Sequence, residues 1–229
     1  RTRGHQLLTH AEIAELEPDL GDRFSSGLFF FSESHICPRS ALTALHQSLL
    51  RDGVEFIVAE RDPTDSSKAG LTIDCRGYSA RDELTNLRGV KGEMLMLSCP
   101  DVTLSRTVRL LHPRIPLYVV PRGNGIYMVG ATMIESSASD HVTARSLLEM
   151  LSAAYALNPA FGEAEVLETG VDIRPAFTDN LPRIQQDGNL IRVNGFYRHG
   201  YLLGPAYARK VGDMLFGQTI TEVPHEHSA

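Results

Sequence analysis

The spacing of hydrophobic and polar positions changes near residue 90 of the chain. Before that point, short apolar runs predict strands at residues 27–31, 54–58 and 71–75, with a polar loop at residues 62–68. Thr9 and Glu12 form a capping-box pattern, which predicts a short helix through Leu16. A second helix is predicted from Pro38 to about Leu50. Strands that alternate with helices indicate an α/β layer.

After residue 92 the apolar, β-prone runs follow one another directly, at residues 93–98, 108–112, 116–121 and 126–133. Consecutive strands favour an antiparallel sheet, and Asn124-Gly125 predicts a hairpin turn between the last two. The remaining pattern predicts helices at residues 141–157 and 204–216 and strands at residues 165–171 and 190–194. The chain is therefore expected to be α+β, with a mixed, largely antiparallel sheet, flanking helices and an incomplete α/β layer.

Composition narrows the classes of function. A net charge of −6 over 229 residues disfavours a nucleic-acid or anionic-membrane partner, and no apolar run approaches the roughly 20 residues of a membrane span. Cys37, Cys75 and Cys99 are odd in number and lack metal-ligand spacing, so reduced thiols in the cytoplasm are expected. His225 and His227 lie in a polar tail, where a solvated end is favoured over a metal site.

Two segments of the last third carry the candidate chemistry, VDIRPAFTDNLPRI at residues 171–184 and NGFYRHGYLLGPA at residues 194–206. Arg174 precedes Pro175, which favours extended backbone, and a planar guanidinium suits bidentate binding of a carboxylate. The second segment has glycines around an aromatic pair, ahead of an apolar helix, so that backbone can approach a flat ligand. Together they predict a substrate with a carboxylate, held against a planar cofactor.

These segments resemble the glycine oxidases of thiamine biosynthesis, which are flavoenzymes of the D-amino-acid oxidase superfamily. The resemblance extends to HAEIAELEPDL, GLFFFSESHICPRSAL, LRGVKGEMLML, LYVVPRGNGIYMVGATM and LLEMLSAAYALNPAF, and so covers nearly all of residues 1–216. It implies FAD as cofactor and oxidative deamination of glycine or a similar small amine. The products would be an imine or glyoxylate, ammonia and hydrogen peroxide, with oxygen as acceptor, and the imine would feed thiazole formation.

The resemblance also assigns roles to particular residues. Arg174, Tyr118 and Arg198 would bind the substrate carboxylate, and Met133 would form a wall over the α-carbon. Contact with the flavin is assigned to Phe196, Tyr197, Arg198, His199, Gly200, Tyr201, Leu202 and Gly77. Without the resemblance, a surface arginine, a half-buried sheet tyrosine and a core methionine are the simpler interpretations. Pro116 stands where some relatives have a histidine, which leaves the substrate range open.

Oxidases of this kind open with a G-x-G-x-x-G turn that binds pyrophosphate, and this sequence has none. We expect the C-terminal part of a longer oxidase, completed by an N-terminal segment or a partner chain, and weak FAD binding by these residues alone. The resemblance divides the chain into residues 1–90 (FAD-binding domain and connecting helix), 91–172 (substrate domain), 173–216 (FAD-binding domain) and 217–229 (disordered tail).

Two alternatives are carried forward. The first is another superfamily member, such as a sarcosine, D-amino-acid or iminodiacetate oxidase or dehydrogenase. The second is a non-catalytic subunit that needs a partner to bind FAD. A homo-oligomer is expected in either case, with no nucleic-acid or membrane partner.

Overall fold

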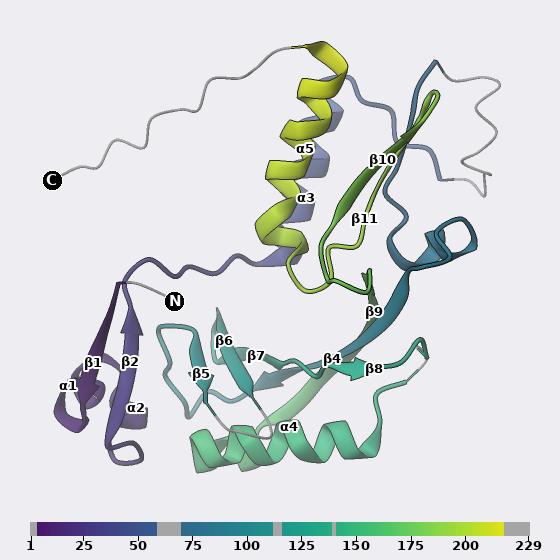
Figure 1. Cartoon of the computed structure of the whole chain (residues 1–229). Coiled ribbons are helices and arrows are strands. Elements are labelled where there is room, and N and C mark those ends of the chain that lie inside the picture. Colours follow the sequence, from purple (N-terminus) through teal and green to yellow (C-terminus); the bar gives the residue numbers. More distant parts are fainter. Residues whose placement is uncertain (1–3, 59–69, 112–115, 139–140, 218–229) are drawn as a thin grey trace, which may run out of the picture. The chain divides into compact units, whose positions relative to one another are not determined.

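The computed structural model describes residues 4–58, 70–111, 116–138 and 141–217 (Figure 1). The predicted loop at residues 62–68 and the tail with His225 and His227 lie outside these ranges. The described chain forms two compact units. The first draws on residues 1–59, 91–134 and 138–172, and the second on residues 60–90, 135–137 and 173–229.

The main sheet is built from strands that follow one another in the sequence. Its order is β5-β6-β7-β4-β8, and β9 also pairs with β4. The strands are β4 (Arg88–Ser98), β5 (Val108–Leu110), β6 (Leu117–Gly123), β7 (Ile126–Gly130), β8 (Ile134–Glu135) and β9 (Glu165–Ala176). The pairs β5–β6, β6–β7 and β4–β7 are antiparallel, which confirms the predicted arrangement.

The hairpin between β6 and β7 has the predicted turn. Asn124 and Gly125 have φ of 54° and 68°, the left-handed backbone that an Asn-Gly turn supplies. A Cβ at position 125 would lie 2.8 Å from the Pro100 Cα, so the close approach of that backbone also requires glycine. The register set by this turn places Tyr118 opposite Gly130.

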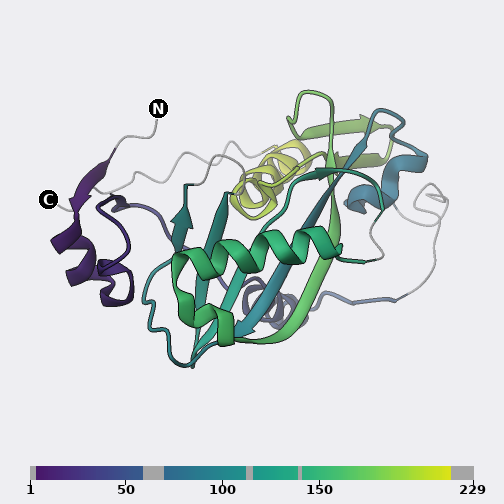
Figure 2. The ribbon, with the colours of Figure 1, turned by 90° about the horizontal axis from the view of Figure 1, so that it is seen from below.

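Helix α4 (Ala144–Leu157) covers one face of the sheet (Figure 2). The Thr143 side chain accepts a hydrogen bond from the Ser146 N–H, so the helix begins at this cap, a few residues later than predicted. Its buried face contributes Met150 and Leu157 to the core, at 1% exposure each. The 3₁₀ turn η3 (Pro159–Glu163) follows it.

The N-terminal elements are β1 (His5–Thr9), α1 (His10–Leu16), α2 (Pro18–Gly21), β2 (Ser26–Phe30) and α3 (Pro38–Arg51). The reciprocal Thr9–Glu12 capping box is present, and α3 has its predicted bounds to within a residue. No α3 residue is buried within the described chain, and Leu42 is 57% exposed. Residues 54–58 form no strand, because within the described chain no neighbouring strand supplies the hydrogen bonds that would define one.

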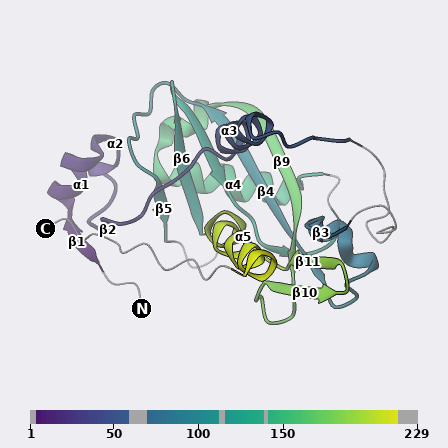
Figure 3. The same cartoon turned by 90° about the horizontal axis from the view of Figure 1, so that it is seen from above.

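The second unit holds a small sheet of β3 (Thr72–Asp74), β10 (Arg183–Asp187) and β11 (Leu190–Asn194), in the order β10-β11-β3. Strands β11 and β3 are parallel, and β10 and β11 are antiparallel. Helix α5 (Gly200–Phe216) packs beside this sheet through Val211, against Ile191 and Val193 (Figure 3). It begins four residues before the predicted start, so Pro205 lies inside the helix. None of the described helices is long and apolar enough to cross a membrane.

Candidate active site

The turn after β11 is the first candidate cofactor-binding element. Asn194, which is 3% exposed, donates from Nδ2 to the Gly77 carbonyl at 2.8 Å and accepts the Gly195 N–H at 2.7 Å. Asn194 thereby joins Gly77 and Gly195, which both have left-handed backbone, with φ of 62° and 84° respectively. Tyr197 also has a positive φ, of 53°. These left-handed residues let the chain turn tightly, and the His199 N–H closes the turn by donating to the Phe196 carbonyl at 2.9 Å.

Arg174 belongs to the same local structure. It lies half-buried in β9, directly before Pro175. The Pro175 carbonyl accepts the Tyr197 N–H at 2.8 Å, so the residue after Arg174 is bonded to the residue before Arg198. Within the second unit, the structure thus brings Arg174, Gly77 and the turn of residues 196–202 into one neighbourhood.

Arg88 supports this turn and was missed in the sequence. Its guanidinium lies 5.9 Å from the centroid of the Tyr197 ring, donates to Glu135 at 2.6 Å and also reaches the Asn180 side chain. A cation near a ring face, fixed by a carboxylate and an amide, restricts where the tyrosine can lie. No local pattern indicates this role, because Glu135 and Asn180 lie 47 and 92 residues away from Arg88.

The residues of this unit fit a flat, polar cofactor such as flavin. No side chain of the described residues caps α5 at His199, and the positive end of the helix dipole lies there. Gly200 and Gly204 lie one helical turn apart, and a Cβ at Gly204 would meet nothing within 4 Å. Tyr201 and Leu202 are 53% and 76% exposed. A glycine face beside exposed apolar side chains leaves room for a planar ring, and the positive end of the helix dipole suits the ring's carbonyl oxygens.

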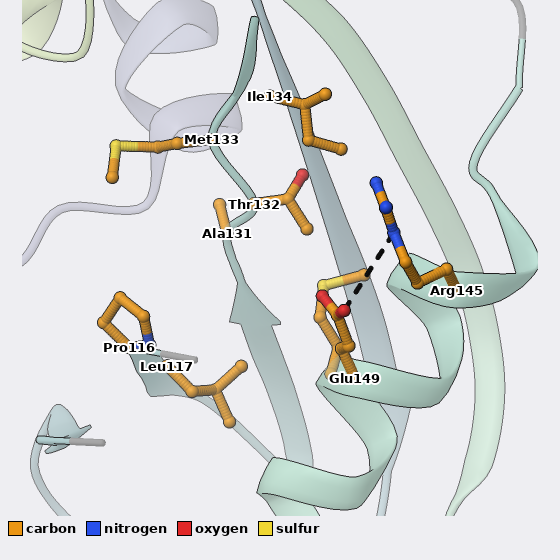
Figure 4. A pocket seen from close by; sticks show the side chains of 9 residues that line it. Pro116, Leu117, Ala131, Thr132, Met133, Ile134, Arg145 and Glu149 are labelled. Carbon is orange, nitrogen blue, oxygen red and sulfur yellow. Dashed lines mark ion pairs between the residues drawn. The ribbon is translucent and has the colours of Figure 1, made fainter. Parts of the chain in front are cut away.

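Tyr118 and Met133 belong to the first unit. The Tyr118 hydroxyl lies 3.5 Å from the position that a Cβ on Gly130 would take, so the phenol extends over a bare stretch of β7. Met133 is 48% exposed, and in Figure 4 its side chain points away from α4. A cavity of about 250 Å³ is lined by Pro116, Leu117, Ala131, Thr132, Met133, Ile134, Arg145, Glu149 and Met150.

Comparison with known proteins gives one consistent family. The profile of the DAO family, FAD dependent oxidoreductases, matches residues 1–214. The thiamine biosynthesis oxidoreductase ThiO of Rhizobium etli is 51% identical over 218 residues, which are 94% of this chain and 65% of that protein. The glycine oxidase of Geobacillus kaustophilus is 30% identical over 92% of this chain and 61% of its own length.

Solved structures agree on the fold. The crystal structure of the Geobacillus kaustophilus glycine oxidase matches 95% of this chain and 65% of its own chain, with a TM-score of 0.80 at 24% identity. The iminodiacetate oxidase of Chelativorans matches 98% of this chain and 66% of its own, with a TM-score of 0.78 at 24% identity. This chain spans about two thirds of the length of these relatives. With a family profile matched over nearly all of its length, the chain belongs to the DAO family of FAD-dependent oxidoreductases.

Proposed function

We propose that this protein uses FAD to oxidise glycine, or a similarly small amine that bears a carboxylate. One observation carries the proposal: the Tyr197 N–H donates to the Pro175 carbonyl at 2.8 Å. This bond ties the strand of Arg174, the proposed carboxylate anchor, to the turn that carries the proposed flavin contacts. The 51% identity to the thiamine biosynthesis oxidoreductase of Rhizobium etli favours a role for the product in thiazole synthesis.

Each proposed substrate contact has a distinct physical task. Arg174 binds the carboxylate through two parallel N–H donors, and Arg198 adds positive charge from the turn. Tyr118 donates its hydroxyl to the same carboxylate as a neutral partner. Met133 closes the space over the α-carbon and disfavours bulky side chains. The resemblance to glycine oxidases supports the assignment of these four residues to one substrate.

The proposed flavin contacts are Phe196, Tyr197, Arg198, His199, Gly200, Tyr201, Leu202 and Gly77. Bound FAD would supply the acceptor for the hydride lost from the substrate's α-carbon. The protein supplies orientation: a carboxylate held at fixed geometry leaves one C–H bond directed at the cofactor, which accounts for much of the rate gain. The positive charge of Arg198 favours negative charge on a ligand at the turn. No strongly basic side chain is required for this chemistry.

The test is a substrate panel with the FAD-loaded oxidase. Peroxide production is measured with glycine, sarcosine, D-alanine and iminodiacetate, alongside dye reduction under anaerobic conditions. We expect glycine to give the highest kcat/KM and oxygen to serve as acceptor. A higher value for sarcosine or iminodiacetate would reassign the substrate within the family. Absence of both peroxide and dye reduction with all four compounds would refute the proposal and favour the non-catalytic alternative.

A further inference from the structure

A charged pair lies buried in the main sheet of the first unit. Lys91 and Glu93 occupy the same face of β4, with the Lys91 ammonium 2.9 Å from Glu93 Oε1. Their side chains are 6% and 0% exposed. The ammonium also donates to the His141 carbonyl at 2.6 Å. A buried pair of this kind persists only where additional hydrogen bonds satisfy both ions.

The Glu93 carboxylate joins two segments that are distant in sequence. Thr132 donates from Oγ1 to Glu93 Oε2 at 3.0 Å, and its hydroxyl oxygen accepts the Glu93 backbone N–H at 2.9 Å. On the other side, the Thr143 N–H at the start of α4 donates to Oε1 at 3.1 Å. The Ser146 side chain adds a further hydrogen bond. Burial raises the pKa of Glu93, but these bonds, together with that from Lys91, outweigh burial and hold the pKa below its ordinary value.

The two segments are opposite walls of the 250 Å³ cavity. Residues 131–134 form one wall, and Arg145 and Glu149 of α4 form the other (Figure 4). Side chains alternate along an extended segment. In Figure 4, Thr132 and Ile134 accordingly point toward α4, whereas Met133 points away from it. The two hydroxyl bonds between Thr132 and Glu93, together with the bond from the Thr132 N–H to the Glu93 carbonyl at 3.1 Å, therefore hold the backbone whose other face presents Met133.

We propose that Glu93 is a positioning residue, which holds the Met133 segment against α4 through Thr132 and so sets the space that Met133 leaves for substrate. The substrate part of this statement rests on the proposed function. The positioning part does not, because every contact that carries it lies within the first unit. The property concerned is the size of the substituent on the α-carbon of a small amino acid. A fixed Met133 excludes a substrate with a methyl group there, and a released Met133 admits it.

The positioning is tested on the chain itself by NMR of ¹³C-methyl-labelled methionines, of which the protein has six. Thr132→Val keeps the side-chain shape but removes both hydroxyl bonds to Glu93. We expect Thr132→Val and Glu93→Gln each to shift the Met133 methyl resonance, and the double variant to shift it no further. The Met214 methyl, in the second unit, should stay in place. Ser146→Ala is the matched control, because it removes one bond to the same carboxylate but leaves both hydroxyl bonds to Thr132 and the bond from the Thr143 N–H at the start of α4.

The substrate part is tested with the FAD-loaded oxidase by the ratio of kcat/KM for D-alanine to that for glycine. One methylene group changes such ratios by roughly tenfold or more in a tight pocket, so we expect Thr132→Val to raise the ratio at least about threefold. Ser146→Ala should leave the ratio near that of the wild type. An unshifted Met133 methyl in Thr132→Val, or additive shifts in the double variant, would overturn the positioning role. An enzyme that oxidises neither compound would refute the proposed function alone, since the NMR result stands by itself.

Discussion

Replacement of Gly195 by alanine should destabilise the second unit more than its backbone angle alone explains. Gly195 has φ of 84°, and a Cβ there would lie 2.3 and 2.5 Å from the Cδ2 and Cε2 atoms of Phe177. The Phe177 ring cannot easily retreat, because it is 1% exposed and packs with Ala80, Leu84 and Leu87. The Arg183 guanidinium also lies 4.3 Å from the ring centroid.

Two costs add at this position. Left-handed backbone costs a residue with a Cβ about 1–2 kcal/mol. Forcing an extra carbon into a packed core costs about 1–3 kcal/mol. Gly195→Ala should therefore lower the free energy of unfolding by about 2–5 kcal/mol, a large part of the roughly 5–15 kcal/mol of a typical domain.

Gly188→Ala supplies the matched control. Gly188 has φ of 55°, and a Cβ there would meet nothing within 4 Å, so only the backbone cost applies. The free energies of unfolding are measured by urea denaturation followed by far-UV circular dichroism. Replacement of Phe177 by leucine should bring the cost of Gly195→Ala down to that of Gly188→Ala. Equal losses in Gly195→Ala and Gly188→Ala would refute the packing argument.

Three further changes test other parts of the structure. Lys91→Met should lower the free energy of unfolding by about 3–5 kcal/mol, because Glu93 stays buried without its cation. The additional change Glu93→Gln should recover part of that loss. An unchanged urea midpoint in Lys91→Met would contradict the argument. The lowered pKa of Glu93 adds stability that is complete above its unfolded value of about 4.5 and is lost as the pH falls through the folded value. Urea midpoints between pH 7 and pH 3 should therefore fall less in Glu93→Gln than in the wild type. Thr9→Ala removes the cap of α1 and should cost about 1 kcal/mol in the same assay, whereas the neighbouring exposed change Gln6→Ala should cost less.

Local signals in the sequence were enough for much of the fold. The Thr9–Glu12 box and the Asn124-Gly125 turn each depend on a few adjacent residues, and both are present in the structure. The run of consecutive strands after residue 92 predicted antiparallel pairing because short turns can connect only such strands. The parallel pairing of β3 with β11 joins residues more than 100 positions apart, and no local pattern encodes it.

Some elements of the structure were not predicted, or differ from the prediction, because local patterns do not encode them. Strands β1 and β10 carry polar residues on both faces, so alternation did not reveal them. Helix α5 begins at Gly200, four residues before the predicted start, and so contains Pro205, a residue that is unfavourable inside a helix. Helix α3 forms as predicted, but none of its residues is fully buried within the described chain.

The candidate site was predictable only in part. Arg174 could be nominated from Pro175 and the family resemblance, but the bond between the Pro175 carbonyl and the Tyr197 N–H depends on tertiary structure. Glu93 gave no signal, because a glutamate in an alternating strand usually faces solvent. Its burial results from Thr132 and the start of α4, which lie 39 and 50 residues away.

The central claim is that Arg174 anchors a substrate carboxylate, and steady-state kinetics of Arg174→Ala in the FAD-loaded oxidase test it most directly. Charge-assisted hydrogen bonds contribute roughly 1.5–3 kcal/mol each, so loss of a bidentate pair should lower kcat/KM for glycine at least about a hundredfold. Arg174→Lys should recover only part of the loss, because an ammonium cannot form two parallel bonds. Flavin content should stay near that of the wild type. A kcat/KM close to wild type in Arg174→Ala would contradict the account.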